Sequence, residues 1–240
     1  MYDCVFAIIE QVVYAVHMRK TDDLVFVSDL HSQAFCEYEL YLRDVRGIDD
    51  PGGDELEEGR NVHAALDMAN FLAGSVEAAK RLAQGKPVPT TLQEVVSVVK
   101  TEQHGMAIRD ILVHGIRLIG RVDQVDFMPD KVYVIDDKPP TPNGLPFISD
   151  TRQVQGYCLA LSQEYPNLGL PLIAVIRDKY TGKDMWSKPF TQGDAFDVND
   201  AVDRILDIRH GKRVPQPTKN PKKHIHCRWS PVCDQSKVER

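Results

Sequence analysis

Two short stretches, Gly120-Arg121-Val122-Asp123 and Val134-Ile135-Asp136-Asp137-Lys138, decide how this sequence is interpreted. Each ends an apolar run typical of a strand, and the short connection between the runs predicts an adjacent antiparallel pair. Because side chains alternate along a strand, Asp136 and Lys138 should share one face, with Asp137 on the other. Two neighbouring carboxylates repel each other unless a cation lies between them. The pattern therefore predicts a Mg²⁺ or Mn²⁺ site flanked by a lysine.

This combination of G-x-x-D and (D/E)-x-K resembles the signature of the PD-(D/E)xK nuclease superfamily. Further features are similar to its RecB branch, which includes the CRISPR-associated Cas-four exonucleases, and the resemblance extends from about Ser28 to Cys233. It implies an α/β (mixed α+β) fold with a restriction-endonuclease-like core, whose central mixed sheet is flanked by helices. It also implies a small metal-cluster cap that joins the N- and C-terminal segments.

The resemblance assigns roles to the charged residues of these two stretches. Asp123 and Asp136 would be metal ligands, and the carbonyl oxygen of Asp137 would be a third ligand. Lys138 would orient the attacking water or balance charge in the transition state. His63, in the stretch Gly59 to His63, would be a fourth ligand, and its imidazole would favour Mn²⁺.

A second pair of residues matches the Q-x-x-x-Y element of the RecB branch. Gln153 and Tyr157 are four residues apart in a segment expected to be helical, so their side chains share a face. In the branch this pair lies beside the metal site and positions the substrate strand or the lysine.

The cysteines suggest a second metal site. There are five, an odd number, and with no secretory leader they argue against a disulfide framework. In the Cas-four group an upstream cysteine joins three downstream cysteines around an iron–sulfur cluster. Cys36, Cys227 and Cys233 match three of these positions, while His224 occupies the fourth. A 4Fe–4S cluster is our first expectation, a structural Zn²⁺ the second and an empty site the third, and His226 could replace His224.

The composition of the chain limits the class of protein to which it can belong. The chain has 240 residues, 42% of them hydrophobic and 27% charged, which is typical of a globular protein with one core. The formal net charge of −6 is unusual for a protein that binds DNA, but nine Lys and Arg against two acidic residues follow from position 209 onward. The apolar run 5–16 is too short to span a bilayer and lacks a basic leader, so we expect a cytoplasmic protein without membrane contact.

Periodicity and turn residues divide the chain as follows. We expect an N-terminal helical segment (1–54) that contributes one cluster ligand, a nuclease core (55–210), and a basic linker with the Cys/His cluster (211–240). Helices are expected at 28–42, from 55 or 61 to 82, at 151–164 and at 195–208, and strands at 95–100, 111–119, 120–127, 131–137, 170–177 and 185–190.

These features together predict a metal-dependent DNA exonuclease acting on single strands or free ends. If it is a CRISPR member, its partner would be the integrase complex; a repair role fits the same residues. The alternatives are an RNase using the same site and a non-catalytic nucleic-acid-binding scaffold that retains the fold.

Overall fold

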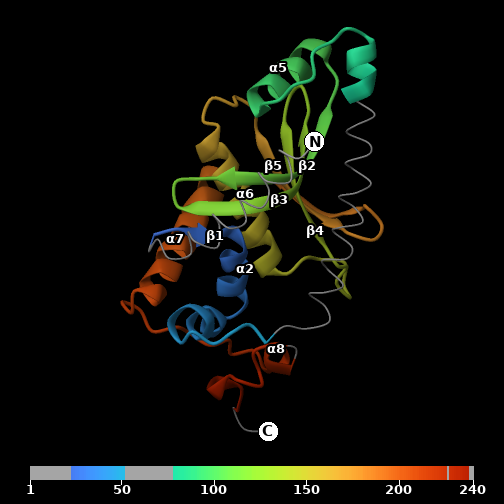
Figure 1. Cartoon of the computed structure of the whole chain (residues 1–240). Coiled ribbons are helices and arrows are strands. Elements are labelled where there is room, and N and C mark those ends of the chain that lie inside the picture. The colour runs from blue at the N-terminus through green and yellow to red at the C-terminus, as the bar shows by residue number, and fades with distance from the viewer. Residues whose placement is uncertain (1–22, 52–77, 226, 238–240) are drawn as a thin grey trace.

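A computed structural model describes residues 23–51, 78–225 and 227–237. Six strands form one mixed sheet with helices packed against it (Figure 1), as the sequence predicts. The strands are β1 (Val25–Phe26), β2 (Met106–His114), β3 (Leu118–Phe127), β4 (Val132–Lys138), β5 (Leu172–Asp178) and β6 (Asp184–Pro189). The main helices are α2 (Val27–Phe35), α3 (Glu37–Leu40), α5 (Leu92–Glu102), α6 (Ile148–Glu164), α7 (Gln192–Arg209) and α8 (Pro221–Ile225).

Strand β3 is the centre of the sheet and has three partners. β2 runs antiparallel along one edge of it, so β1 and β4 share the other edge. On that shared edge β1 pairs with Leu118 and Ile119, and β4 pairs only with the stretch from Gln124 to Phe127. Among the described residues, the stretch 120–123 between these two contacts has no strand partner on that edge. Farther out, β4 runs parallel to β5, and β5 antiparallel to β6.

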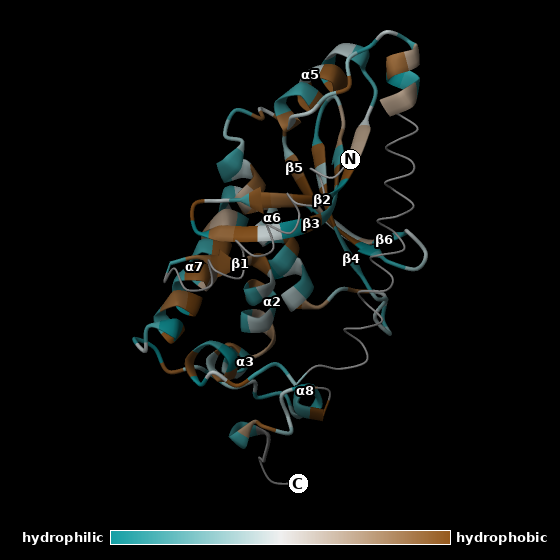
Figure 2. Cartoon of the chain, in the orientation of Figure 1, coloured by the Kyte–Doolittle hydropathy of each residue, from teal (hydrophilic) through white to brown (hydrophobic). Residues whose placement is uncertain are grey.

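The helix α6 packs against the sheet and against α2 and α7, and the apolar side chains between them form the main core. Figure 2 shows how hydrophobic residues concentrate in the strands and in the helices that cover them. The packing explains the glycine of G-x-x-D: a Cβ on Gly120 would lie 2.7 Å from Tyr157 Cε1 and 2.8 Å from Val27 Cβ. Glycine at 120 thus allows α2 and α6 to approach the sheet closely.

Three predictions differ from the structure. The strands predicted at 111–119 and 120–127 are divided elsewhere, because a turn at 115–117 ends β2 at His114 and β3 begins at Leu118. The segment 95–100, predicted as a strand, belongs to helix α5. Its valines favour a strand, but Thr91 and Glu94 form a reciprocal capping box that starts a helix, and Val95 and Val99 are buried on one helical face. The helix predicted over 28–42 is interrupted at Cys36, whose backbone is extended between α2 and α3. The helix predicted from 55 or 61 to 82 lies mostly outside the described residues.

A second, smaller core joins the C-terminal segment to the region after α3. It contains Leu42, Trp229 and Cys233, with Tyr38 and Cys227 packed against it. Figure 1 shows α8 and the chain after it beside the α2–α3 region, at the end of the molecule away from α5.

No helix within the described ranges is long and apolar enough to cross a membrane.

Candidate metal centre and active site

The two motif carboxylates lie where β3 and β4 stop pairing. The backbone ladder between these strands ends at Gln124 and Ile135, one residue before Asp123 and Asp136. Beyond that point the backbone N–H of Asp137 donates to Asp123 Oδ2 (2.7 Å) instead of to a strand carbonyl. The end of the ladder thus creates space for two carboxylates and orients one of them.

Because both carboxylates are buried, their charged forms are unfavourable in the absence of a cation. Burial, reinforced by the charge of Asp136, raises the pKa of Asp123 to about 8. Burial also raises the pKa of Asp136, and Lys138 offsets only part of this effect. Two buried acidic groups with raised pKa values that act on each other are typical of functional sites.

Lys138 belongs to a chain of polar contacts that leads to helix α6. Its Nζ lies 3.1 Å from Asp136 Oδ2 and donates to Gln153 Oε1 at 2.9 Å. Gln153 Nε2 in turn donates to the hydroxyl of Tyr157 at 3.1 Å. Burial works against the charge of Lys138, but the carboxylates of Asp136, Asp150 and Asp123 outweigh it and raise the lysine pKa. Lys138 is therefore an ammonium ion at neutral pH.

The donor set fits a divalent cation. Asp136 Oδ2 is buried, and although Lys138 is near, this oxygen has no hydrogen-bond partner in the part of the chain that the structure describes. A buried carboxylate oxygen whose close contact is an ion pair rather than a well-aligned hydrogen bond is suited to bind a cation as well. Asp123, Asp136 and the carbonyl of Asp137 would hold Mg²⁺ or Mn²⁺. That carbonyl points to the same strand edge as its own N–H, toward Asp123.

The proposed fourth ligand cannot be placed, because His63 lies outside the described residues. Within those residues no three His, Cys, Asp or Glu side chains form a ready metal site. The assignment of His63 stays a prediction.

The structure adds two residues that the sequence analysis did not single out. Asp150, in the first turn of α6, accepts a hydrogen bond from the N–H of Phe147, and its Oδ1 lies 3.4 Å from His31 Nε2. Burial opposes its charge, but His31, Lys138 and that N–H outweigh burial and lower the pKa of Asp150. A lone histidine and a helix-start aspartate carry no sequence signal, since only the packing of α2 on α6 brings them together.

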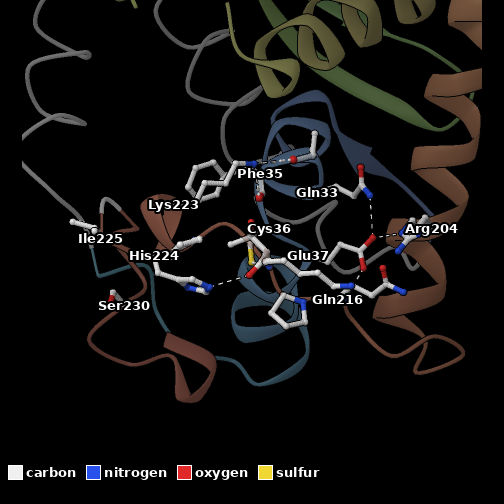
Figure 3. A pocket seen from close by; sticks show the side chains of 15 residues that line it. Gln33, Phe35, Cys36, Glu37, Arg204, Gln216, Lys223, His224, Ile225 and Ser230 are labelled. Atoms are coloured by element: carbon white, nitrogen blue, oxygen red, sulfur yellow. Dashed lines mark hydrogen bonds and ion pairs between the residues drawn. The ribbon is translucent and has the colours of Figure 1, made fainter. Parts of the chain in front are cut away.

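The predicted cluster residues that the structure describes lie in one region, although no three of them are grouped closely enough to form a ready metal site. Cys36 and His224 line a cavity of about 1170 Å³ between α2–α3 and the C-terminal segment (Figure 3). Cys227 and Cys233 lie in the small core beside it, and burial raises the pKa of Cys227, with a smaller contribution from Cys36 and Cys233. His226 lies outside the described residues. The structure thus brings Cys36, Cys227 and Cys233 into one region.

Contacts around this cavity hold two of the candidate ligands in place. The N–H of Thr218 donates to Cys36 Sγ (3.3 Å), and the carbonyl of Thr218 lies 2.9 Å from His224 Nε2. If Nε2 carries the proton, Nδ1 of His224 is left as the available donor atom. Metal-binding histidines commonly use their second nitrogen in this way.

Comparisons with known proteins give weak similarities. No family model matches the sequence, and no curated protein matches it. Among solved structures, the chain is similar to SSO0001, with 16% identity, 90% of this chain and 88% of that chain covered, and a TM-score of 0.41. It is also similar to a provisionally assigned exonuclease from Eubacterium rectale, with 15% identity, coverage of 91% and 89%, and a TM-score of 0.47. An alkaline exonuclease from Laribacter hongkongensis gives 12% identity, coverage of 79% and 89%, and a TM-score of 0.33. At these values the chemistry has to be judged from the site itself.

Proposed function

We propose that the protein is a metal-dependent nuclease of the RecB-like type, which hydrolyses phosphodiester bonds at the site formed by Asp123, Asp136 and Lys138. The observation that carries this proposal is the pair of buried carboxylates with raised pKa values next to a lysine ammonium. A protein without a cation or a phosphate to bind would gain nothing from burying these charges together.

The roles of the residues follow from their charges and contacts. A bound Mg²⁺ or Mn²⁺ would polarise the scissile phosphate and favour deprotonation of the attacking water. Lys138, which is positively charged, would stabilise the negative charge that develops on the phosphate oxygens. Gln153 holds the ammonium group of Lys138, and Tyr157 holds Gln153, so the pair fixes the lysine before the substrate arrives.

The substrate that fits best is a nucleic-acid strand with unpaired bases. Three apolar side chains are exposed in the segment that leads from Lys138 into α6, with exposed fractions of 61% for Leu145, 61% for Phe147 and 76% for Ile148. The N–H of Phe147 is bonded to Asp150, which fixes its backbone beside the site. Unpaired bases stack on exposed aromatic rings, whereas bases within a duplex are already stacked.

The cluster region belongs to the same proposal. We propose that Cys36, Cys227, Cys233 and His224 bind a 4Fe–4S cluster, with Zn²⁺ as the alternative. The support is their common region and the hydrogen bonds from Thr218 to Cys36 and between Thr218 and His224. Such a site would tie the C-terminal segment to α2–α3, and the resemblance to the Cas-four exonucleases would make the CRISPR integrase complex a partner.

The experiment is a cleavage assay on single-stranded DNA, single-stranded RNA and duplex DNA, labelled at either end, with Mg²⁺ or Mn²⁺. We expect the native protein to shorten single-stranded DNA and Asp136→Asn to be at least about 100-fold slower, as expected when an electrostatic group of the site is lost. The matched control is Asp110→Asn, because Asp110 is exposed and its positive φ of 58° suits asparagine. Native protein that cuts none of the three substrates would contradict the proposal. Cleavage of RNA alone would identify RNA, rather than DNA, as the substrate.

A further inference from the structure

The face of the sheet opposite the carboxylate pair carries a closed polar network across four adjacent strands. Its members are Arg109 on β2, Gln124 on β3, Asp137 on β4 and Arg177 on β5. Arg177 grips the Asp137 carboxylate with two parallel hydrogen bonds, from Nε to Oδ1 (2.7 Å) and from Nη2 to Oδ2 (2.9 Å). Arg109 donates to the same Oδ2 (2.7 Å), and both arginines donate to Gln124 Oε1 (2.6 and 3.0 Å).

The network is buried, so its geometry is tightly restricted. The side chain of Asp137 is 1% exposed, that of Arg109 9% and that of Arg177 16%. Burial opposes the charge of Asp137, but the two arginines outweigh burial and lower its pKa. A planar guanidinium that bonds a carboxylate through two parallel bonds fixes its orientation as well as its distance.

The position of the network connects it to the proposed metal site. Asp137 is the residue whose N–H orients Asp123 and whose carbonyl would be a metal ligand, and it lies beyond the last backbone pair of β3 and β4. Strand β4 is held there on the other side by β5, where Asp137 pairs with Arg177. Between β3 and β4 at this level, the Asp137–Asp123 bond on one face and the network on the other replace the missing ladder.

We propose that Arg109 and Arg177 are positioning residues: by clamping the Asp137 side chain, they fix the Asp137 backbone and the Asp123 carboxylate for metal binding on the opposite face. The inference rests on the proposed function, since it assigns the clamp a role only at that metal site. The arginines themselves touch neither the metal nor the substrate, and they act through Asp137.

A purely structural role for Arg109 and Arg177 can be distinguished from this positioning role by measuring the affinity for a cation. The network would then stabilise the sheet without affecting the affinity for a cation. Metal affinity measured on folded protein without substrate separates the two roles, because it does not depend on the fraction of molecules that unfold or on turnover.

The test is Mn²⁺ binding to metal-free protein, followed by the electron paramagnetic resonance signal of free Mn²⁺. In Arg177→Lys the positive charge remains but the two parallel bonds are lost. We expect Mn²⁺ to bind about 10-fold or more weakly, the effect typical of partners that orient metal ligands. In cleavage assays at a fixed, subsaturating Mn²⁺ concentration, kcat should fall while KM for the strand stays unchanged. Arg109→Lys leaves the Arg177 fork intact and should weaken Mn²⁺ binding less, and it supplies the test if Arg177→Lys does not fold.

The matched control is Arg81→Lys, which removes a comparable two-bond contact, with Glu102, outside both the network and the cavity near Cys36. It should lower thermal stability and leave Mn²⁺ affinity unchanged. Native affinity in folded Arg177→Lys and Arg109→Lys would overturn the clamp while leaving the proposed function intact. Absence of Mn²⁺ binding in the native protein would overturn the proposed function, and the clamp with it.

Discussion

At the scale of single residues, Asp123 and Asp136 are both buried beside Lys138. Burial raises the pKa of both carboxyl groups and the lysine offsets only part of this effect, which is the reason for proposing a cation there. The sequence predicted this pair because strand alternation and the short β3–β4 connection follow from local patterns. The sequence could not predict how deeply the two carboxylates are buried, because this depends on how α2 and α6 cover them.

The raised pKa of Asp123 predicts that the stability of the metal-free protein falls as the pH rises. Because its folded pKa, about 8, exceeds the ordinary value of 3.8, its stabilising contribution is complete below about pH 4 and is lost as the pH rises through 8. In the chelator EDTA at pH 9, Asp123→Asn should therefore be more stable than the native protein by about 1 to 3 kcal/mol, since asparagine removes the buried charge and keeps an oxygen for the Asp137 N–H. Urea unfolding at pH 5 and pH 9 measures this. A variant that is less stable than the native protein at pH 9 would contradict the burial argument.

Gly120 gives a prediction based on packing. A Cβ at this position would overlap Tyr157 and Val27, so Gly120→Ala should lower the free energy of unfolding by about 1 to 3 kcal/mol, the usual cost of overpacking a core. Because Tyr157 has to move, its hydrogen bond with Gln153 should weaken and cleavage should slow. The control is Gly193→Ala in α7, where the nearest atom to an added Cβ is Thr191 Oγ1 at 3.6 Å. If both variants unfold at the native urea concentration, the close packing at Gly120 is refuted.

At the scale of elements, the strands and helices around the site were predictable, and the exceptions have physical causes. β4 was predicted from its apolar run and the short turn before it, and α6 was predicted as the helix after the proline-rich loop. The segment around Val95 was misassigned because β-branched residues favour strands, whereas the start of α5 is set by the cap at Thr91. The juxtaposition of His31 and Asp150 could not be predicted, since nothing local in either segment encodes how α2 crosses α6.

The segment before α6 leads to a prediction about substrate binding. Phe147→Ala should raise KM for single-stranded DNA several-fold, because base–aromatic stacking contributes about 1 to 3 kcal/mol per base, while Phe147→Tyr should retain affinity. Phe196→Ala is the matched control, as Phe196 is 73% exposed on α7. Strand affinity can be measured by fluorescence anisotropy in the Asp136→Asn background, which prevents cleavage. Equal affinity for Phe147→Ala and Phe196→Ala would exclude stacking at this position.

At the scale of the whole molecule, long-range ion pairs join the segments that enclose the core. Glu37 on α3 pairs with Arg204 on α7 and accepts hydrogen bonds from Gln33 and from the N–H of Gln216 (Figure 3). The family resemblance of the sequence implied that Cys36 and the C-terminal cysteines meet, and the structure brings them into one region. The sequence could not reveal the role of Glu37 in joining these segments, because a glutamate on a helix is usually solvent-exposed.

The Glu37 network should make stability depend on pH in the acid range. Burial opposes the charge of Glu37, but Arg204, the Gln216 N–H and Gln33 outweigh it and lower its pKa below 4.5. Its contribution is present above pH 4.5 and is lost as the pH falls through the lowered value. Glu37→Gln should thus be about 1 to 3 kcal/mol less stable than the native protein at pH 7, with the difference shrinking toward pH 3. Urea unfolding at the two pH values checks this, and a difference that grows on acidification would disprove it.

Mn²⁺ titration of the metal-free protein by calorimetry is the decisive test of whether Asp123 and Asp136 form a divalent cation site. At pH 7 we predict saturable binding accompanied by proton release, because Asp123, with a pKa of about 8, has to lose its proton to become a ligand. Titrations in two buffers of different ionisation enthalpy reveal the released proton, and Asp136→Asn should bind Mn²⁺ far more weakly. An absence of binding to the native protein, or equal binding to Asp136→Asn, would contradict the account.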